Sequence, residues 1–151
     1  QYKVSGSPNT VTPDAYGGGL IYIGGHASAV NGKRYNGSIR AFDPTVNKTV
    51  WQLGLPGEDY GAPVYANGLV VVTGGDDLFV LDAATGHVLF NYSANAPFLA
   101  APSVAHGIIY IGNSNGMVLA FGLPNPASTY GVTFRGTGLP PVGCGARPSR
   151  A

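Results

Sequence analysis

The stretch Gly61-Ala-Pro-Val-Tyr-Ala-Asn-Gly68-Leu-Val-Val-Val-Thr73 returns in altered form as Ala101-Pro-Ser-Val-Ala-His-Gly107-Ile-Ile-Tyr-Ile-Gly112. The Ala-Pro pair and the central glycine of the two copies both lie 39 residues apart. An earlier copy precedes them as Thr12-Pro13-Asp-Ala-Tyr-Gly-Gly-Gly19-Leu-Ile-Tyr-Ile-Gly24. A fixed period of this length is the signature of a repeat architecture, so we expect about three similar units.

The second half of each unit repeats as well. Residues 39–43 match residues 79–82, and residues 117–121 close the third unit. The first unit carries an insertion over residues 26–35, and we expect this loop to be the most function-like feature because long loops on rigid scaffolds often bind ligands or partners. Each unit contains short runs of Val, Ile, Leu, Tyr and Phe between Gly- and Asn-containing turns, which is typical of antiparallel strands.

The inner runs are apolar at every position, which indicates strands covered on both faces. Together with a period of roughly 40 residues, this predicts an all-β fold of about three four-stranded antiparallel propeller blades over residues 12–124. Residues 1–11 are expected to form an N-terminal arm. Residues 125–151 form a Pro/Gly-rich tail or assembly arm, in which residues 130–134 are β-prone.

One motif in these units resembles a known family. Ala41-x-Asp43-x-x-x-Asn47-x-x-x-Trp51 and Asp82-Ala-Ala-Thr85-Gly86-His-Val-Leu-Phe90 are similar to the tryptophan-docking motif of quinoprotein (PQQ-type) β-propellers, and residues 119–124 resemble the closing strand of their dehydrogenases. The sequence departs from the family pattern at the following positions: Asn47 replaces Gly, Val46 replaces Thr, Phe90 replaces Trp and Val80 replaces Ala.

The motif also has a physical interpretation without the family. Asp43 and Asp82 each end a strand, where a carboxylate can accept turn amide hydrogens. Asn47 and Gly86 supply the positive φ of such turns. The aromatic residue eight positions after each aspartate is expected to cover a neighbouring sheet. We therefore interpret these residues as structural.

The resemblance implies two classes of function. Under one, the protein is a non-catalytic scaffold or self-assembling oligomer or filament that needs no cofactor. Under the other, it is the C-terminal part of a PQQ- and calcium-dependent alcohol or sugar dehydrogenase, with quinone on the propeller axis. No catalytic or quinone-binding residue can be assigned, and no Glu, Asn and Asp ligand set can be carried over; the chain also lacks the adjacent cysteines of many such enzymes. We therefore favour the scaffold.

Candidate ligands for a metal are few. Asp76-Asp77 is an acidic pair that could bind a hard cation such as calcium through oxygen ligands, but turn chemistry after Gly74-Gly75 explains it more simply. Glu58-Asp59 receives the same interpretation. The three histidines, His26, His87 and His106, are expected in separate turns without ligand spacing.

Composition excludes other classes of function. Eight Lys and Arg balance seven Asp and Glu, so the chain has no basic surface for nucleic acid, and no apolar run approaches the roughly 20 residues that span a bilayer.

Sequons at Asn36, Asn47 and Asn91 favour a secreted or extracellular glycoprotein. The single Cys144 excludes an intrachain disulfide, which leaves a disulfide to another chain or an idle thiol. Gln1 in place of Met suggests either a processed chain or a piece of a longer one.

The number of units governs the functional expectation. A closed propeller requires at least about four blades, whereas this chain holds about three. We therefore expect an arc with an exposed apolar sheet face at both ends, which water penalises at roughly 25 cal/mol per Å². Copies of the same chain, or the remaining blades of a parent chain, are the expected partners that cover these faces.

Overall fold

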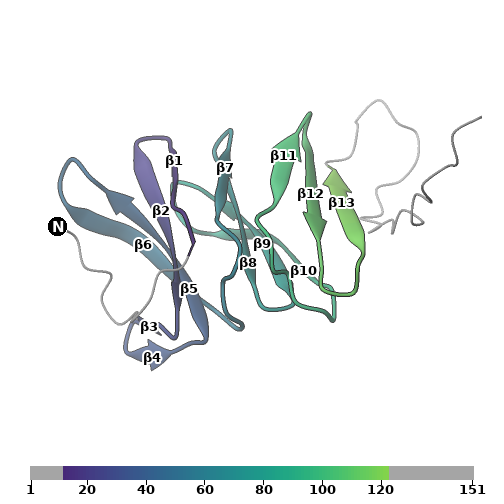
Figure 1. The fold of residues 1–151 in the computed structure, drawn as a ribbon. Coiled ribbons are helices and arrows are strands. Elements are labelled where there is room, and N and C mark those ends of the chain that lie inside the picture. Colours follow the sequence, from purple (N-terminus) through teal and green to yellow (C-terminus); the bar gives the residue numbers. More distant parts are fainter. Residues whose placement is uncertain (1–11, 123–151) are drawn as a thin grey trace, which may run out of the picture.

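The computed structural model describes residues 12–122, and these residues form consecutive antiparallel sheets (Figure 1). The all-β prediction is confirmed. The predictions for the N-terminal arm, for residues 125–151 and for Cys144 lie outside the described residues. Within residues 12–122 there is no helix of the length and apolarity that crossing a membrane requires.

Three sheets follow one another along the chain, and we call them blades 1, 2 and 3. Blade 1 contains β1 (Ala15–Gly17), β2 (Leu20–His26), β5 (Gly37–Asp43) and β6 (Lys48–Leu55). Blade 2 contains β7 (Val64–Ala66), β8 (Leu69–Gly74), β9 (Asp77–Asp82) and β10 (Val88–Ser93). Blade 3 contains β11 (Ser103–Ala105), β12 (Ile108–Gly112) and β13 (Val118–Gly122). A hairpin of β3 (Ala29–Val30) and β4 (Lys33–Arg34) interrupts blade 1.

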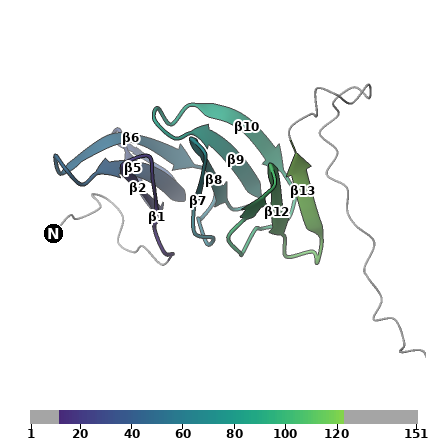
Figure 2. The same cartoon turned by 90° about the horizontal axis from the view of Figure 1, so that it is seen from above.

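Blades 1 and 2 are four-stranded, as predicted, whereas blade 3 has three strands within residues 12–122. Apart from the insertion between β2 and β5, the strands of each blade are joined in chain order by tight turns, with positive φ at, for example, Gly68 and Gly107. Figure 2 shows the three sheets side by side, and the first strands β1, β7 and β11 are neighbours. This is the arrangement of successive blades in a propeller.

The register makes the three blades directly comparable. Tyr22 pairs with Ala41 in blade 1, and the corresponding pairs are Val71 with Val80 and Tyr110 with Ala120. The equivalent positions on this face include Leu20, Leu69 and Ile108; Tyr22, Val71 and Tyr110; Ile39, Leu78 and Val118; and Ala41, Val80 and Ala120.

We call the face of a sheet that points to the next blade its forward face, and the opposite face its backward face. The forward face of blade 1 packs on the backward face of blade 2 in one core, and blade 2 packs on blade 3 in a second. The first core contains Leu20, Tyr22, Ile39, Ala41, Trp51, Leu53 and Leu55 from blade 1 and Tyr65, Val70, Val72, Phe79 and Leu81 from blade 2. Stacking thus covers both faces of blade 2, which explains its uninterrupted apolar run at residues 69–72.

Candidate functional site

The structure places the aspartates of the repeat motif at the ends of their strands. The Asp43 carboxylate accepts hydrogen bonds from the Thr45 amide at 2.8 Å and the Thr45 hydroxyl at 2.6 Å. The Asp82 carboxylate does the same with the Thr85 amide at 2.8 Å and hydroxyl at 2.7 Å. The hydroxyl bonds are the main reason that the pKa of each carboxyl lies below its usual value. Both aspartates serve turns.

The aromatic residues of the motif connect neighbouring blades. Trp51 of blade 1 donates its indole N–H to the Ala83 carbonyl of blade 2 at 2.9 Å. Its ring lies on Gly86, where an added Cβ would come within 2.6 Å of the indole. In blade 2 the equivalent Phe90 meets Phe121 of blade 3, with ring centroids 5.8 Å apart. These contacts hold successive sheets together, whereas Asn47 (φ 54) and Gly86 (φ 72) shape the turns.

Tyr22 makes a second connection between blades 1 and 2. Its ring stacks on Tyr65 of blade 2, with centroids 5.8 Å apart and planes 12° apart. Its hydroxyl donates to the same Ala83 carbonyl that accepts from Trp51, at 3.2 Å. A tyrosine on this forward-face position therefore inserts into the next blade and finds both an aromatic partner and an acceptor there.

A buried acid lies where the chain crosses from blade 1 to blade 2. Asp59 is fully buried, and neither carboxylate oxygen has a hydrogen-bond partner among the described residues. The Thr73 hydroxyl, also buried, points toward it without reaching hydrogen-bond geometry and likewise lacks a partner. Burial raises the pKa of the Asp59 carboxyl to about 8, and the Thr73 hydroxyl offsets only part of this rise.

The interpretation of Asp59 as a turn residue was wrong. The repeat explains its position, because Phe98 lies 39 residues later, is also fully buried, and occupies the equivalent crossover. The main chain is the same at both places: Gly75 N–H donates to the Glu58 carbonyl at 2.8 Å, and Ser114 N–H donates to the Pro97 carbonyl at 2.9 Å. A carboxyl group therefore occupies a site that the repeat fills with a phenyl ring. Aligning the crossovers would have revealed it in the sequence.

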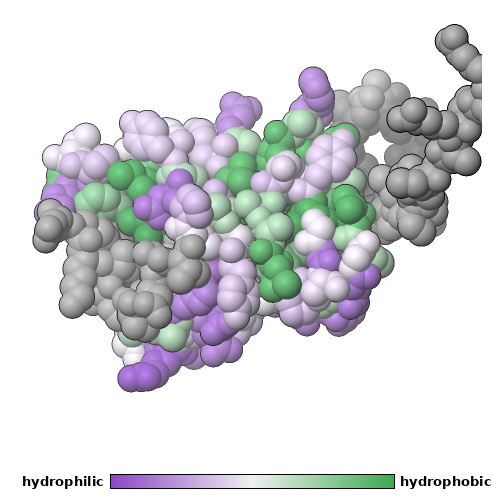
Figure 3. Space-filling model, in the orientation of Figure 1, coloured by the Kyte–Doolittle hydropathy of each residue, from purple (hydrophilic) through white to green (hydrophobic). Residues whose placement is uncertain are grey.

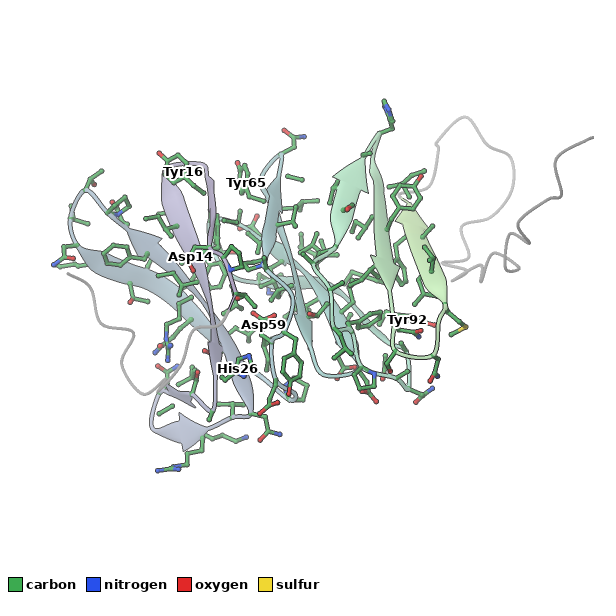
Figure 4. The ribbon with its side chains drawn as sticks, in the orientation of Figure 1. Asp14, Tyr16, His26, Asp59, Tyr65 and Tyr92 are labelled. Atoms are coloured by element: carbon green, nitrogen blue, oxygen red, sulfur yellow. The ribbon has the colours of Figure 1, made fainter. Side chains whose placement is uncertain are left out.

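Polar and aromatic groups surround this acid at the entrance to the crossover. The His26 imidazole Nε2 lies at hydrogen-bond distance from the Asp59 carbonyl, and its ring meets Tyr60 edge-on with centroids 5.1 Å apart. Tyr60 in turn donates its hydroxyl to Glu58. His26 is the last residue of β2, and the expectation that it lies in a turn was therefore wrong. Figure 4 shows His26 and Asp59 close together between blades 1 and 2.

The acidic pair predicted from the sequence, Asp76 and Asp77, lies where β8 turns into β9. Asp76 lies in the tight turn between β8 and β9, and Asp77 is the first residue of β9. Within these residues no group of three or more His, Cys, Asp or Glu could hold a metal ion. The sequon residues Asn47 and Asn91 are exposed. Asn36 is exposed as well, but its amide donates to the Pro56 carbonyl at 2.7 Å.

The insertion in blade 1 folds over the backward face of its own sheet. Residues of the insertion contact four positions that share this face of β5 and β6. The Ser38 hydroxyl donates to the Ser28 hydroxyl at 2.7 Å, and the Arg40 guanidinium donates to the Ala29 carbonyl at 2.9 Å. The Gln52 amide donates to the Asn31 side chain at 2.8 Å, and the Tyr35 ring covers Gly54. The hairpin thus forms a cap. A shallow hollow lined by Ala27, Arg34, Tyr35 and Asn36 remains at its edge.

The expectation of exposed apolar faces at both ends of the arc was therefore wrong for the part of blade 1 that the hairpin covers, whereas Tyr16 on the same face is 70% exposed. On its backward face Ile23 and Phe42 are buried, and so are the polar Ser38 and Arg40. Arg40 occupies the position of Leu119 in blade 3, where the backward face packs on blade 2. Sequence reasoning missed this because the insertion was interpreted as a binding loop.

Within residues 12–122, the forward face of blade 3 is not covered by another sheet. Tyr110 is 38% exposed and Val118 49% exposed, whereas the equivalent residues of blades 1 and 2 are at most 1% exposed. Figure 3 views the three blades from the side and shows hydrophobic residues interspersed with polar ones across them. None of the residues that alternate onto this face is charged: Ser103, Ala105, Ile108, Tyr110, Gly112, Val118, Ala120 and Gly122.

Known proteins share this architecture. A family described as outer membrane protein assembly factor BamB matches residues 35–123. BamB of Nitrosomonas eutropha is 33% identical over 113 residues, which is 71% of this chain and 25% of that protein. The chain thus spans about a quarter of the length of the curated relatives it matches.

Two solved structures illustrate the likeness of fold. BamB from Moraxella catarrhalis superposes with a TM-score of 0.61 at 13% identity, over 77% of this chain and 33% of that one. Quinohemoprotein alcohol dehydrogenase from Comamonas testosteroni gives a TM-score of 0.65 at 19% identity, over 80% of this chain and 20% of that one. At such identities the likeness concerns the fold alone.

Proposed function

The chain belongs to the PQQ-like β-propeller repeat family, and from this premise we propose that it is a non-catalytic scaffold whose partial propeller is completed by further blades. Those blades come from copies of the chain, in an oligomer or filament, or from the rest of a longer polypeptide. The observation that supports this function is the forward face of blade 3, which exposes residues that the two internal junctions bury.

The site chemistry also favours a scaffold. The motif aspartates accept hydrogen bonds within their turns, and the motif aromatics pack between blades. The buried acid Asp59 is enclosed in a blade junction, away from any substrate that approaches through solvent. Under this proposal the protein needs neither PQQ nor calcium. The names of its BamB relatives, outer membrane protein assembly factors, fit a protein whose surfaces serve other proteins.

We place the protein outside the cytoplasm. The exposed sequon residues Asn47 and Asn91 support this location, because glycan addition requires a secreted chain and an accessible side chain. A decrease in mass after glycosidase treatment of the native protein tests this part of the proposal.

Photo-cross-linking tests the scaffold. A photoreactive phenylalanine replaces Val118 in the chain produced in its own cells, and the same group replaces Val88, an exposed valine on the outer strand of blade 2, as the matched control. We expect position 118, and not position 88, to cross-link to a peptide from a PQQ-like blade. Equal cross-linking at both positions contradicts the proposal. So does dye-linked alcohol or sugar oxidation by the purified protein with PQQ and calcium.

A further inference from the structure

The β3–β4 hairpin presents two cations to solvent. Lys33 and Arg34 make up strand β4, and both residues are exposed. Figure 1 places the hairpin at the lower end of blade 1, and Figure 3, in the same orientation, shows strongly hydrophilic residues there. The insertion therefore contacts its own sheet through Ser28, Asn31 and Tyr35 and still carries charge toward molecules outside the chain.

The charge of the hairpin is opposite to that of the rest of the arc. Residues 12–122 contain four Lys and Arg and seven Asp and Glu. Two of the four cations lie on the hairpin, a third, Arg40, is buried beneath it, and Lys48 is exposed on β6. An anionic partner is therefore attracted to the hairpin and repelled by most of the remaining surface, which determines where it docks.

A shallow hollow of about 190 Å³ lies beside Arg34, and Ala27, Tyr35 and Asn36 complete its lining. Among residues 12–122 no hydrogen bond or ion pair engages the Arg34 guanidinium. Asn36 is held in place because its side-chain amide donates one hydrogen to the Pro56 carbonyl at 2.7 Å. The NH₂ group of Asn36 has a second hydrogen that a ligand can accept. The hollow thus combines a positive charge with hydrogen-bond donors.

The backbone at this hollow is held in an uncommon conformation. Ala27 has a φ of 43°, whereas the other non-glycine residues with positive φ in residues 12–122 are Asn and His. Asn tolerates this region, but alanine is disfavoured there because of its Cβ. Two main-chain hydrogen bonds hold the strained chain, from the Ala27 amide to the Asn36 carbonyl at 2.6 Å and from the Tyr35 amide to the Ser28 carbonyl at 2.9 Å. The hollow is therefore preformed, and strain of this kind clusters at ligand sites.

We infer that the hollow beside Arg34 is a docking site for a carboxylate of a partner protein, presented by an Asp or Glu side chain. A guanidinium is planar and can donate to both oxygens of one carboxylate. A hollow this shallow does not enclose a small molecule, as ligand pockets do, but it can receive one side chain from a protein surface. The inference goes beyond the proposed function and concerns a different surface of the molecule.

A hexaglutamate peptide, acetylated and amidated at its ends, provides the probe. Binding to the full chain is followed by ¹H–¹⁵N NMR, which includes the side-chain resonances of Arg34 and Asn36. We expect saturable shifts at Ala27, Arg34 and Asn36. A hexaglutamine peptide of the same length should leave these resonances unchanged. Hexaglutamate that produces no saturable shift at these residues overturns the inference.

Two matched variants separate a site from a general attraction of charge. Arg34→Gln and Lys48→Gln each remove one exposed cation, so they change the net charge equally. We expect Arg34→Gln to weaken peptide binding by about tenfold or more and Lys48→Gln to change it by less than about twofold. Arg34→Lys keeps the charge without the planar geometry and should lie between them.

Equal weakening by Arg34→Gln and Lys48→Gln overturns the inference, because it shows attraction without a site. Displacement of the peptide by inorganic phosphate at concentrations where acetate has no effect overturns it as well, because the hollow then prefers phosphate to carboxylate. The cross-linking test at Val118 probes another blade, so none of these outcomes decides the proposed function.

Discussion

Replacement of Asp59 by asparagine tests whether the blade junction holds a neutral acid. The carboxyl has a pKa of about 8 in the folded protein and an ordinary value of 3.8, so the folded state binds its proton more tightly than the unfolded state. Its favourable contribution to stability is complete below pH 3.8 and is lost as the pH rises toward 8. Asn has almost the same shape and does not ionise.

The magnitude follows from the two pKa values. About three pH units separate the ordinary pKa from pH 7, and each unit corresponds to about 1.4 kcal/mol. The wild-type free energy of unfolding should therefore decline, relative to that of Asp59→Asn, by about 4 kcal/mol between pH 4 and pH 7. Above pH 8 the difference should become constant, because the group is then ionised in both states.

Urea unfolding at a series of pH values from 4 to 9 measures this difference directly. Asp43 and Asp82 titrate with the opposite sign, so the informative quantity is the wild type minus the variant at each pH. Asp76→Asn, which removes one carboxyl from the β8–β9 turn, is the matched control for the loss of one acidic side chain. If Asp59→Asn runs parallel to the wild type, the carboxyl is not held protonated in the junction and the reasoning is refuted.

Three further substitutions test the blade contacts by the same urea assay. Trp51→Phe keeps an aromatic ring but removes the indole N–H that donates a hydrogen bond to the Ala83 carbonyl, and it should lower the free energy of unfolding by about 1 kcal/mol. An unchanged free energy of unfolding would show that this hydrogen bond is dispensable. Gly86→Ala places a Cβ at positive φ against Trp51 and should lower the free energy of unfolding by roughly 2 kcal/mol, an effect that Trp51→Ala should relieve in part. Thr85→Val removes the main hydrogen bond that lowers the pKa of Asp82, so the acid unfolding transition should move to higher pH; an unmoved transition contradicts that role.

Much of the architecture could be predicted because the repeat is explicit in the sequence. The recurrence of Ala-Pro and Gly at 39 residues determines where strands begin, and the apolar runs indicate sheets that stack on both faces. Asp43 and Asp82, each eight residues before an aromatic residue, likewise predict the turns and the interblade contacts at Trp51 and Phe90. Local residue types carry this information without knowledge of the tertiary contacts.

The remaining features depend on contacts across the fold, which local patterns do not contain. Lys33, Arg34 and Tyr35 look like a binding loop in sequence, yet the hairpin folds back because Ser28 and Asn31 find partners on β5 and β6. In the sequence Asp59 resembles the second residue of an acidic pair in an exposed turn, and only its equivalence to Phe98 indicates that it is buried. For Asp59 the deciding information is a comparison between repeats, whereas for the hairpin it is the set of contacts with β5 and β6.

A comparison between blades also shows how the two ends of the arc differ. Each blade presents a forward and a backward face, so a stack of such sheets is polar along its length. The hairpin covers the β5 and β6 part of the backward face of blade 1 and leaves Tyr16 on β1 exposed, whereas Tyr110 and Val118 are exposed on the forward face of blade 3. Blade 3 therefore carries, at Tyr110, the residue type that blade 1 buries against blade 2 at Tyr22, and the repeat itself explains why this position is a tyrosine although it is exposed here.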